Sequence, residues 1–592
     1  MKNKEFLFVT KDEVEKEIEE ILKKFEINKI FKIIILMMER IFNDLEKSPK
    51  YKEAFAEELS YLLYLKLKNE KEEINLKKLS LFDVSEELEG KNKLLNNLYY
   101  LLEVRNLLRD MEVYCLQQNY DIECKNNSYQ LIHPIKDYIH FYKLGYLLNY
   151  LESSTFSMNS VIETNTLVDD ILDKIKIDFP NMLNFQVKDE NTIYERIEYK
   201  FHPSFLGQLY KFFTALHGSL YCNTMSKYLQ NSQIDIEEKC INKGELRWID
   251  LINFSIVMQY ISSYINSTIK NNAKSNRMAY NSRIFAMENQ QFKKFFIEIF
   301  QQINPKIREN EIRKIMNSFS FDIENDKERI DLQFKPIMNF GSYRIILLNS
   351  FANTDIIRAY IQNNNLQLDD QGNKFENEVY SILKKGFPNI EIFKSVKYKD
   401  KFNKKGEIDL CFKIKNNIYF IECKNPKLPI SASSSTNNYL YIQKAKKQLE
   451  FAEEYFNEDK KLFLQKHLRC NINEMEDYKV FKIIVLANRN VSGLNIEDIA
   501  IRDIFSLTRL IDIGSVSSYY IDSKLNKVDI KEVSLYENNS YFQEIDFIKY
   551  ISEKFIFHEE INKYLQKFTR TITYKGNNFS TFDYCINNVN KY

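Results

Sequence analysis

Apolar residues recur at spacings of three and four positions in six stretches of roughly the first 230 residues. This period predicts amphipathic helices that bury one face. Tyr and Phe are dense in these stretches, and we interpret them as a core between packed helices and not as a base-stacking surface. The predicted helices cover Lys11–Phe25, Lys29–Leu45, Lys52–Leu67, Lys93–Gln117, Ile135–Leu151 and Pro203–Leu229.

A second mainly helical stretch covers about 240–365 and contains a short strand-like interlude at 330–337 and 343–348. The polar segment 362–372 is rich in turn-forming residues and predicts a boundary. After it the pattern predicts one helix, three strands, a long helix and a further strand, which is typical of an α/β sandwich around a small mixed sheet. These six elements cover 374–385, 390–398, 407–414, 418–423, 439–456 and 480–487.

A chain of 592 residues is too long for one compact core. The predicted fold class is therefore multidomain, α plus α/β, with a large helical N-terminal region before the α/β core. We divide it into a helical domain, a second mainly helical connector, the α/β domain and a C-terminal α/β extension of unknown role. The corresponding ranges are 1–235, 236–368, 369–525 and 526–592.

Charge is unevenly distributed, although the whole chain carries only +1. Residues 371–450 hold sixteen Lys against eight Asp and Glu, a net +8. Such a segment suits a phosphate backbone, and a local fluctuation in a Lys-rich composition explains it equally well. The eight cysteines form no Cys-x-x-Cys pair, the first residues show no signal pattern, and the longest apolar run is too short for a bilayer. We expect a cytoplasmic protein with no membrane partner.

Two alternating runs on either side of Asn416-Asn417 predict a β-hairpin, because Asn tolerates the positive φ of a two-residue turn. In that register Lys415 pairs with Ile418, so that Asp409 lies opposite Lys424 and Cys411 opposite Glu422. Opposed residues and residues two apart share a face of the sheet. The two carboxylates and the lysine therefore converge, while the other face is apolar and faces the core: Leu410, Phe412, Ile414, Tyr419 and Ile421.

A structural salt bridge is the simplest alternative for these three residues, but two carboxylates and a lysine at the middle of a sheet are costly for stability alone. Asp409, Glu422 and the backbone carbonyl of Cys423 are hard oxygen ligands that suit Mg²⁺, with Mn²⁺ as a substitute. Such a metal would polarise a scissile phosphate, and Lys424 could orient the attacking water or neutralise developing charge.

The stretches around Glu376, Gly406-Glu-Ile-Asp409 and Ile421-Glu422-Cys-Lys424 resemble the PD-(D/E)XK nuclease superfamily, especially its restriction-endonuclease-like, Mrr-type branch. The resemblance covers about 371–490 and implies that Glu376, on the first helix, is a further metal ligand or a neighbour of the ligands. It also implies a Gln on the helix after the catalytic strand, where both Gln443 and Gln448 qualify and the local sequence favours Gln448. The usual Pro before the Asp is replaced by Ile408.

The resulting prediction is a Mg²⁺-dependent endonuclease acting on DNA, with restriction or anti-phage defence as the role suggested by analogy. RNA is not excluded as substrate, and a catalytically silent module that binds nucleic acid or a protein partner is the alternative. We expect the segment 431–438 to be a mobile loop. The helical N-terminal region could bind an accessory protein or form a homodimer. Lys444, Lys446 and Lys447 are expected to contact phosphates.

Overall fold

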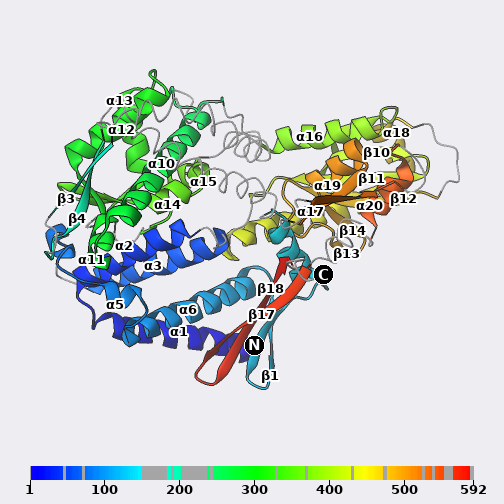
Figure 1. Ribbon diagram of the computed structural model, residues 1–592. Coiled ribbons are helices and arrows are strands. Elements are labelled where there is room, and N and C mark those ends of the chain that lie inside the picture. Colours follow the sequence, from blue (N-terminus) through cyan, green and yellow to red (C-terminus); the bar gives the residue numbers. More distant parts are fainter. Residues whose placement is uncertain are drawn as a thin grey trace.

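The computed structural model describes most of the chain, and the account below concerns only these residues (Figure 1). The described ranges are 2–44, 49–69, 74–149, 183–188, 192–201, 237–240, 244–323, 325–326, 330–366, 371–427, 432–470, 477–522, 527–536, 541–552 and 565–586. The predicted helix at 203–229 lies outside them. The mixed α plus α/β architecture predicted from the sequence is confirmed, whereas the domain boundaries stay predictions.

The N-terminal region is a layered set of helices, coloured blue in Figure 1. The apolar helix α2 is buried on almost every side, which explains its unbroken run of Ile, Leu and Met. Residues 138–149 are also helical, as predicted. The bounds are α1 Lys2–Leu22, α2 Ile27–Asn43, α3 Pro49–Asn69, α4 Leu76–Leu79, α5 Ser85–Leu88 and α6 Lys93–Gln117.

Strands were missed in this region. A four-stranded sheet of order β1-β2-β18-β17 joins residues from both ends of the sequence, with β18 parallel to β2. β1 and β2 have five residues each, which is too few alternations for a sequence pattern to reveal a strand. The strands are β1 Asp121–Lys125, β2 Ser128–Ile132, β17 Leu565–Tyr574 and β18 Asn577–Ile586, and a separate hairpin pairs β3 Leu183–Lys188 with β4 Arg196–Phe201.

The middle region packs helices around a four-stranded sheet of order β5-β8-β7-β6. The strand expected at Ile330 begins only at Ile337, because Asp331 accepts hydrogen bonds from the amides of Gln333 and Phe334 and so forms a turn. The helices are α10 Trp248–Asn272, α11 Asn276–Ser282, α12 Asn289–Ile303, α13 Glu309–Ser318, α14 Leu348–Asn353 and α15 Ile356–Asn363; the strands are β5 Phe285–Glu288, β6 Ser320–Asp322, β7 Ile337–Phe340 and β8 Tyr343–Ile346.

The third region is built on a six-stranded mixed sheet of order β13-β14-β12-β11-β10-β9, in which β11, β12 and β14 are parallel. All six predicted elements between 374 and 487 are present. They are α16 Gln371–Gly386, β9 Ile392–Lys399, β10 Lys405–Ile414, β11 Asn417–Lys424, α17 Ala432–Glu458 and β12 Lys479–Leu486. Further elements are α18 Lys460–Leu468, β13 Asn495–Ile496, β14 Ile499–Asp503, α19 Ile504–Thr508, a π-helix Arg509–Ile513, β15 Ser515–Asp522, β16 Lys527–Ser534 and α20 Glu544–Ile551.

Both faces of this sheet are buried. One face packs on α16, α19 and α20 and contains the five residues predicted to face a core: Leu410, Phe412, Ile414, Tyr419 and Ile421. The other face packs on α17, where Ile418 and Phe420 join Ile442 and Leu449. This second core is continuous with the core of α1–α6, so the N-terminal helices and the sheet are packed as one body.

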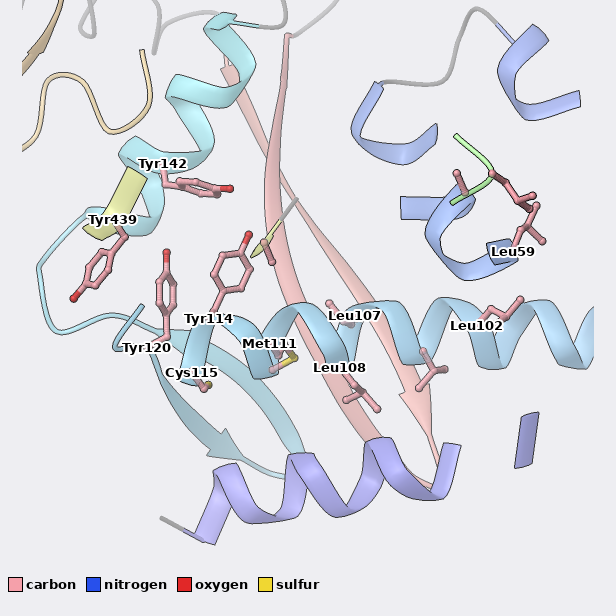
Figure 2. Close-up of a cluster of buried hydrophobic side chains, with 14 of the residues drawn as sticks. Leu59, Leu102, Leu107, Leu108, Met111, Tyr114, Cys115, Tyr120, Tyr142 and Tyr439 are labelled. Carbon is pink, nitrogen blue, oxygen red and sulfur yellow. The ribbon is translucent and has the colours of Figure 1, made fainter. Parts of the chain in front are cut away.

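Gln118, next to the end of α6, anchors the first turn of α17. Its buried Nε2 donates to the carbonyl of Ala432 at 3.0 Å and to Ser435 Oγ at 2.6 Å. Figure 2 shows Tyr439 of α17 beside Tyr120, near the end of α6. The predicted mobile loop at 431–438 is therefore wrong, because α17 already begins at Ala432. Tertiary contacts outweigh the low helix propensity of this Ser- and Asn-rich segment.

None of the described helices combines the length and the hydropathy needed to cross a bilayer. The six cysteines that the structure describes are free thiols.

Candidate active site

The β10–β11 hairpin turns one residue earlier than predicted. Lys415 and Asn416 form the turn, with Lys415 at a φ of 51°, and Ile414 pairs with Asn417. Asn417 is held in the strand because it pairs with Lys479 of β12 and its side chain donates to Glu544 at 2.8 Å. The predicted pairs are therefore wrong by two residues, and Cys411 lies opposite Phe420.

A shift of two residues leaves every side chain on its predicted face. Asp409 lies just beyond Leu410–Ile421, the last β10–β11 pair, and has no partner on β9, where Ser395 adopts a φ of 51°. This break in both ladders frees the Asp409 carboxylate to turn toward β11. Its Oδ2 accepts a hydrogen bond from the backbone N–H of Cys423 at 2.7 Å.

The structure brings Asp409, Glu422 and Lys424 together. Lys424 Nζ lies 2.6 Å from Glu422 Oε2 and 3.3 Å from Asp409 Oδ2, so one ammonium group bridges both carboxylates. The Glu422 side chain is fully buried, whereas those of Asp409 and Lys424 keep 11% and 12% of their surface exposed. Asp409 and Lys424 thus form the more exposed part of the group.

The surroundings of Glu422 favour its neutral, protonated form. Burial, reinforced by the charge of Asp409 and opposed by Lys424, raises the pKa of Glu422 to about 8. Burial acts to lower the pKa of Lys424, but the two carboxylates outweigh it and the net pKa is raised. Lys424 therefore stays charged, while a proton or a cation is needed to neutralise the buried carboxyl.

Glu376 lies at the edge of this group, on α16. Its side chain is half-buried, and its pKa is raised by burial and by the charge of Asp409, against the effect of Lys424. Its carboxyl is thus within electrostatic reach of Asp409 and Lys424. Glu378 is exposed, in keeping with its weaker candidacy.

Glu422 and two other residues of this domain have buried polar atoms without partners in the part of the chain that the structure describes. Among the described residues, Glu422 Oε1, Gln448 Oε1 and the Tyr398 hydroxyl are buried and make no hydrogen bond. Buried oxygen atoms without partners are rare and indicate a place for a ligand, an ion or water. This observation favours Gln448 over Gln443, which has no such buried atom.

Tyr398 was not predicted as a site residue, because its only sequence signal is indirect. Its ring lies 5.4 Å from that of Phe451 and 4.6 Å from that of Tyr455, and its pKa is raised by burial and then by the charge of Glu422. A Cβ at Gly406 would lie 2.3 Å from the Tyr398 ring. The Tyr398 ring therefore requires a glycine at position 406, the first residue of the Gly-Glu-Ile-Asp stretch. This requirement could be inferred only once β9 and β10 were paired.

The donor set fits Mg²⁺ better than a metal held entirely by side chains. In the described residues, no three His, Cys, Asp or Glu side chains are arranged to hold a metal on their own. Mg²⁺ usually keeps several waters and takes one or two carboxylates. Asp409, Glu422 with its partnerless buried Oε1, and the Cys423 carbonyl would supply that number of ligands, with Glu376 beside them.

The three lysines expected to contact phosphates differ in their surroundings. Lys444 and Lys447 are exposed on α17. Lys446 is half-buried and forms ion pairs with Glu497 at 2.7 Å and Glu450 at 3.5 Å. A phosphate would have to displace these carboxylates to reach Lys446.

Residues 371–487 match the family described as NERD, Nuclease-related domain, which is a PD-(D/E)XK-like nuclease domain. The match covers about a fifth of the chain and ends one residue after β12. It includes Glu376, Asp409, Glu422, Lys424 and Gln448. No curated protein and no solved structure matches the chain.

Proposed function

We propose that the chain is a Mg²⁺-dependent endonuclease whose substrate is DNA. The observation that carries this proposal is the Asp409–Lys424–Glu422 group with a buried, partnerless Glu422 oxygen inside a nuclease-related domain. A purely structural ion pair usually has hydrogen-bond partners for its buried oxygens. Mn²⁺ is expected to replace Mg²⁺, because both prefer oxygen ligands.

Each residue has a separate task in this proposal. Asp409 and Glu422 would hold the metal together with the Cys423 carbonyl and Glu376. The metal, when bound, supplies Lewis-acid polarisation of the phosphate and a hydroxide nucleophile at neutral pH. Lys424, which stays charged, stabilises the negative charge that develops on the phosphate. Gln448 orients a water molecule or the substrate beside Glu422.

DNA is preferred over RNA because the site resembles restriction-endonuclease-like nucleases, and within that superfamily we propose the Mrr-type branch. The site itself binds phosphate and does not read the sugar, so RNA remains the second substrate to test. A role in restriction or anti-phage defence follows by analogy with that branch. We place the protein in the cytoplasm and assign partner recognition to the helical N-terminal region.

The test is cleavage of plasmid, single-stranded DNA and RNA by the full chain with Mg²⁺ or Mn²⁺. Asp409→Ala and Lys424→Ala are each expected to lose activity by at least about a hundredfold. Glu378→Ala is the matched control, because it removes an exposed carboxylate on the same helix as Glu376. It should retain wild-type activity.

The outcomes separate the alternatives. Undiminished cleavage by both site variants contradicts the assignment of the site. Binding of nucleic acid by the wild type without any cleavage, with either metal, favours the silent binding module. Cleavage of RNA alone keeps the site and replaces the substrate.

A further inference from the structure

The hairpin between β9 and β10 presents one large aromatic side chain to solvent. Phe402, at its tip, is 78% exposed, the highest value among the large hydrophobic side chains that the structure describes. An isolated exposed apolar residue is ordinary on a protein surface. Phe402 differs from such a residue because it extends from a hydrogen-bonded turn and is flanked by lysines.

The loop that carries Phe402 is rigidly constructed. The Asp400 carboxylate accepts hydrogen bonds from the amides of Phe402 at 2.9 Å and Lys404 at 2.7 Å. The backbone of Asp400 also donates to the carbonyl of Lys404 and accepts from the amide of Asn403, which has a φ of 63°. The phenyl ring therefore extends from a fixed turn and has already lost much of the backbone entropy that binding would otherwise cost.

β9 and β10 carry opposed lysines next to the tip, and this pair of like charges destabilises the hairpin. Lys399 and Lys405 are directly opposed in the β9–β10 ladder, and neither forms an ion pair in the described part of the chain. Like charges in opposed positions destabilise a sheet. The hairpin also exposes four further lysines and contains one acidic residue between the first and the last of them, so it forms a basic stripe: Lys394, Lys397, Lys399, Lys401, Lys404 and Lys405.

The stripe leads to the candidate active site. Lys405 and Glu407 lie two positions apart and share a face of β10, and Asp409 follows at the break in the ladder. Glu376, whose carboxyl responds to Asp409, also responds to the charges of Glu407 and Lys394. A polyanion lying along this face would therefore pass from the paired lysines to the carboxylates that hold the metal.

We propose that this hairpin binds a nucleic-acid strand, with its phosphates along Lys399 and Lys405 and one of its bases stacked on Phe402. The proposal rests on the proposed nuclease function and extends it by locating the substrate. Phosphates and bases are the two groups that a lysine stripe with a single aromatic ring can bind together. A surface that inserts into lipid usually presents several apolar side chains, and this hairpin tip presents one.

The test measures binding by full-length Asp409→Asn protein in Mg²⁺, so that the probe is not cut. Fluorescence anisotropy would use a single-stranded and a duplex oligonucleotide, each containing 2-aminopurine to report base stacking. Phe402→Ala is expected to weaken binding by about tenfold and to abolish the 2-aminopurine quenching. Lys399→Gln/Lys405→Gln is expected to weaken binding and to lower the salt slope by roughly 1.5 to 2.

Matched controls remove similar groups elsewhere. Tyr541→Ala removes another exposed aromatic side chain, 63% exposed, and Lys77→Gln/Lys78→Gln removes two exposed lysines of α4. Both should bind as the parent does. Each replaced side chain is exposed, so no variant should melt below the parent, and Lys399→Gln/Lys405→Gln should melt at or slightly above it because it removes a like-charge pair. Loss confined to one oligonucleotide identifies whether the stacked base is paired or unpaired.

Parent-like binding by both hairpin variants overturns the proposal. So does a loss of binding to phosphatidylserine vesicles with nucleic-acid binding unchanged, which would make the hairpin a membrane contact. Failure of the nuclease function itself appears in a different assay, as no cleavage by the wild type with either metal, and failure of the site as cleavage that survives Asp409→Ala and Lys424→Ala. The two failures are therefore distinguishable.

Discussion

Two fully buried glutamates, Glu39 in α2 and Glu422 in β11, differ in what satisfies them. Burial raises the pKa of each to about 8. Glu39 accepts hydrogen bonds on both oxygens from the backbone amide of Asn349, at 3.1 and 3.0 Å, and a third from its side chain. Glu422 has Lys424 on one oxygen and no partner on the other among the described residues.

A raised carboxyl pKa does not by itself mark a reactive site. Glu39 fastens α2 to α14, and every oxygen it buries is used. Glu422 buries an oxygen that is unused and has a second carboxylate beside it, and these two features together indicate a ligand.

The largest difference is expected in catalysis. Glu422→Gln should reduce Mg²⁺-dependent cleavage by about a hundred- to a thousandfold, because it removes a charged metal ligand. Glu39→Gln should keep cleavage within about twofold of the wild type, since its carboxylate bonds Asn349 of α14 and not the residues of the site. Initial rates on plasmid measure both. Equal losses would mean that Glu422 acts only as a structural residue.

Metal affinity should depend on pH at one of the two glutamates only. Glu422 must lose its proton to bind Mg²⁺, so affinity should rise by up to about tenfold per pH unit as the pH approaches 8 and level off above it. Titration calorimetry between about pH 6 and pH 9 would show this. Glu39→Gln should keep the wild-type profile, and a flat wild-type profile would contradict the ligand assignment.

Stability should reveal the property that the two glutamates share. Both have folded-state pKa values above those of the unfolded chain, so each ionises first in the unfolded state. The wild type should therefore lose stability relative to Glu39→Gln or Glu422→Gln as pH rises from about 4.5 to 8, with no further change above 8. In metal-free protein, scanning fluorimetry should show a relative change of about 2–4 °C in melting temperature. A difference that is independent of pH would contradict the shifted pKa values.

The smallest effect is expected from the glutamines of α17. Gln448→Ala should lower the cleavage rate by about three- to tenfold, because its buried oxygen lacks any other partner. Gln443→Ala, on the same helix, is the control and should leave the rate unchanged. Reversal of the two results would move the assignment to Gln443.

Local patterns were sufficient for much of the fold. The 3.6-residue period predicted α6 at its observed bounds, Lys93–Gln117, and alternation predicted β9 to β12 to within two residues at each end. The convergence of Asp409, Glu422 and Lys424 was predictable because it depends on the faces of two adjacent strands. An error of two residues in register does not alter a face.

Long-range contacts account for what could not be predicted. The turn lies at Lys415-Asn416 because Asn417 pairs with a strand that begins more than sixty residues later. The Ser-rich segment is helical because Gln118, more than three hundred residues away, anchors it. Tyr398 entered the site only when its strand was placed beside Gly406. None of these partners leaves a trace in the local sequence.

The sheet of β1, β2, β17 and β18 can form only after the C-terminal strands have been synthesised. Phe579 of β18 pairs with Tyr129 of β2, some 450 residues earlier, and both rings pack on Phe6 of α1. At about 5–20 residues per second, a ribosome needs roughly 20 to 90 seconds to travel between them. Throughout that interval the edge of β2 and the aromatic surface of α1 stay open on the nascent chain. The whole nuclease-related domain is thus made before the N-terminal sheet can close.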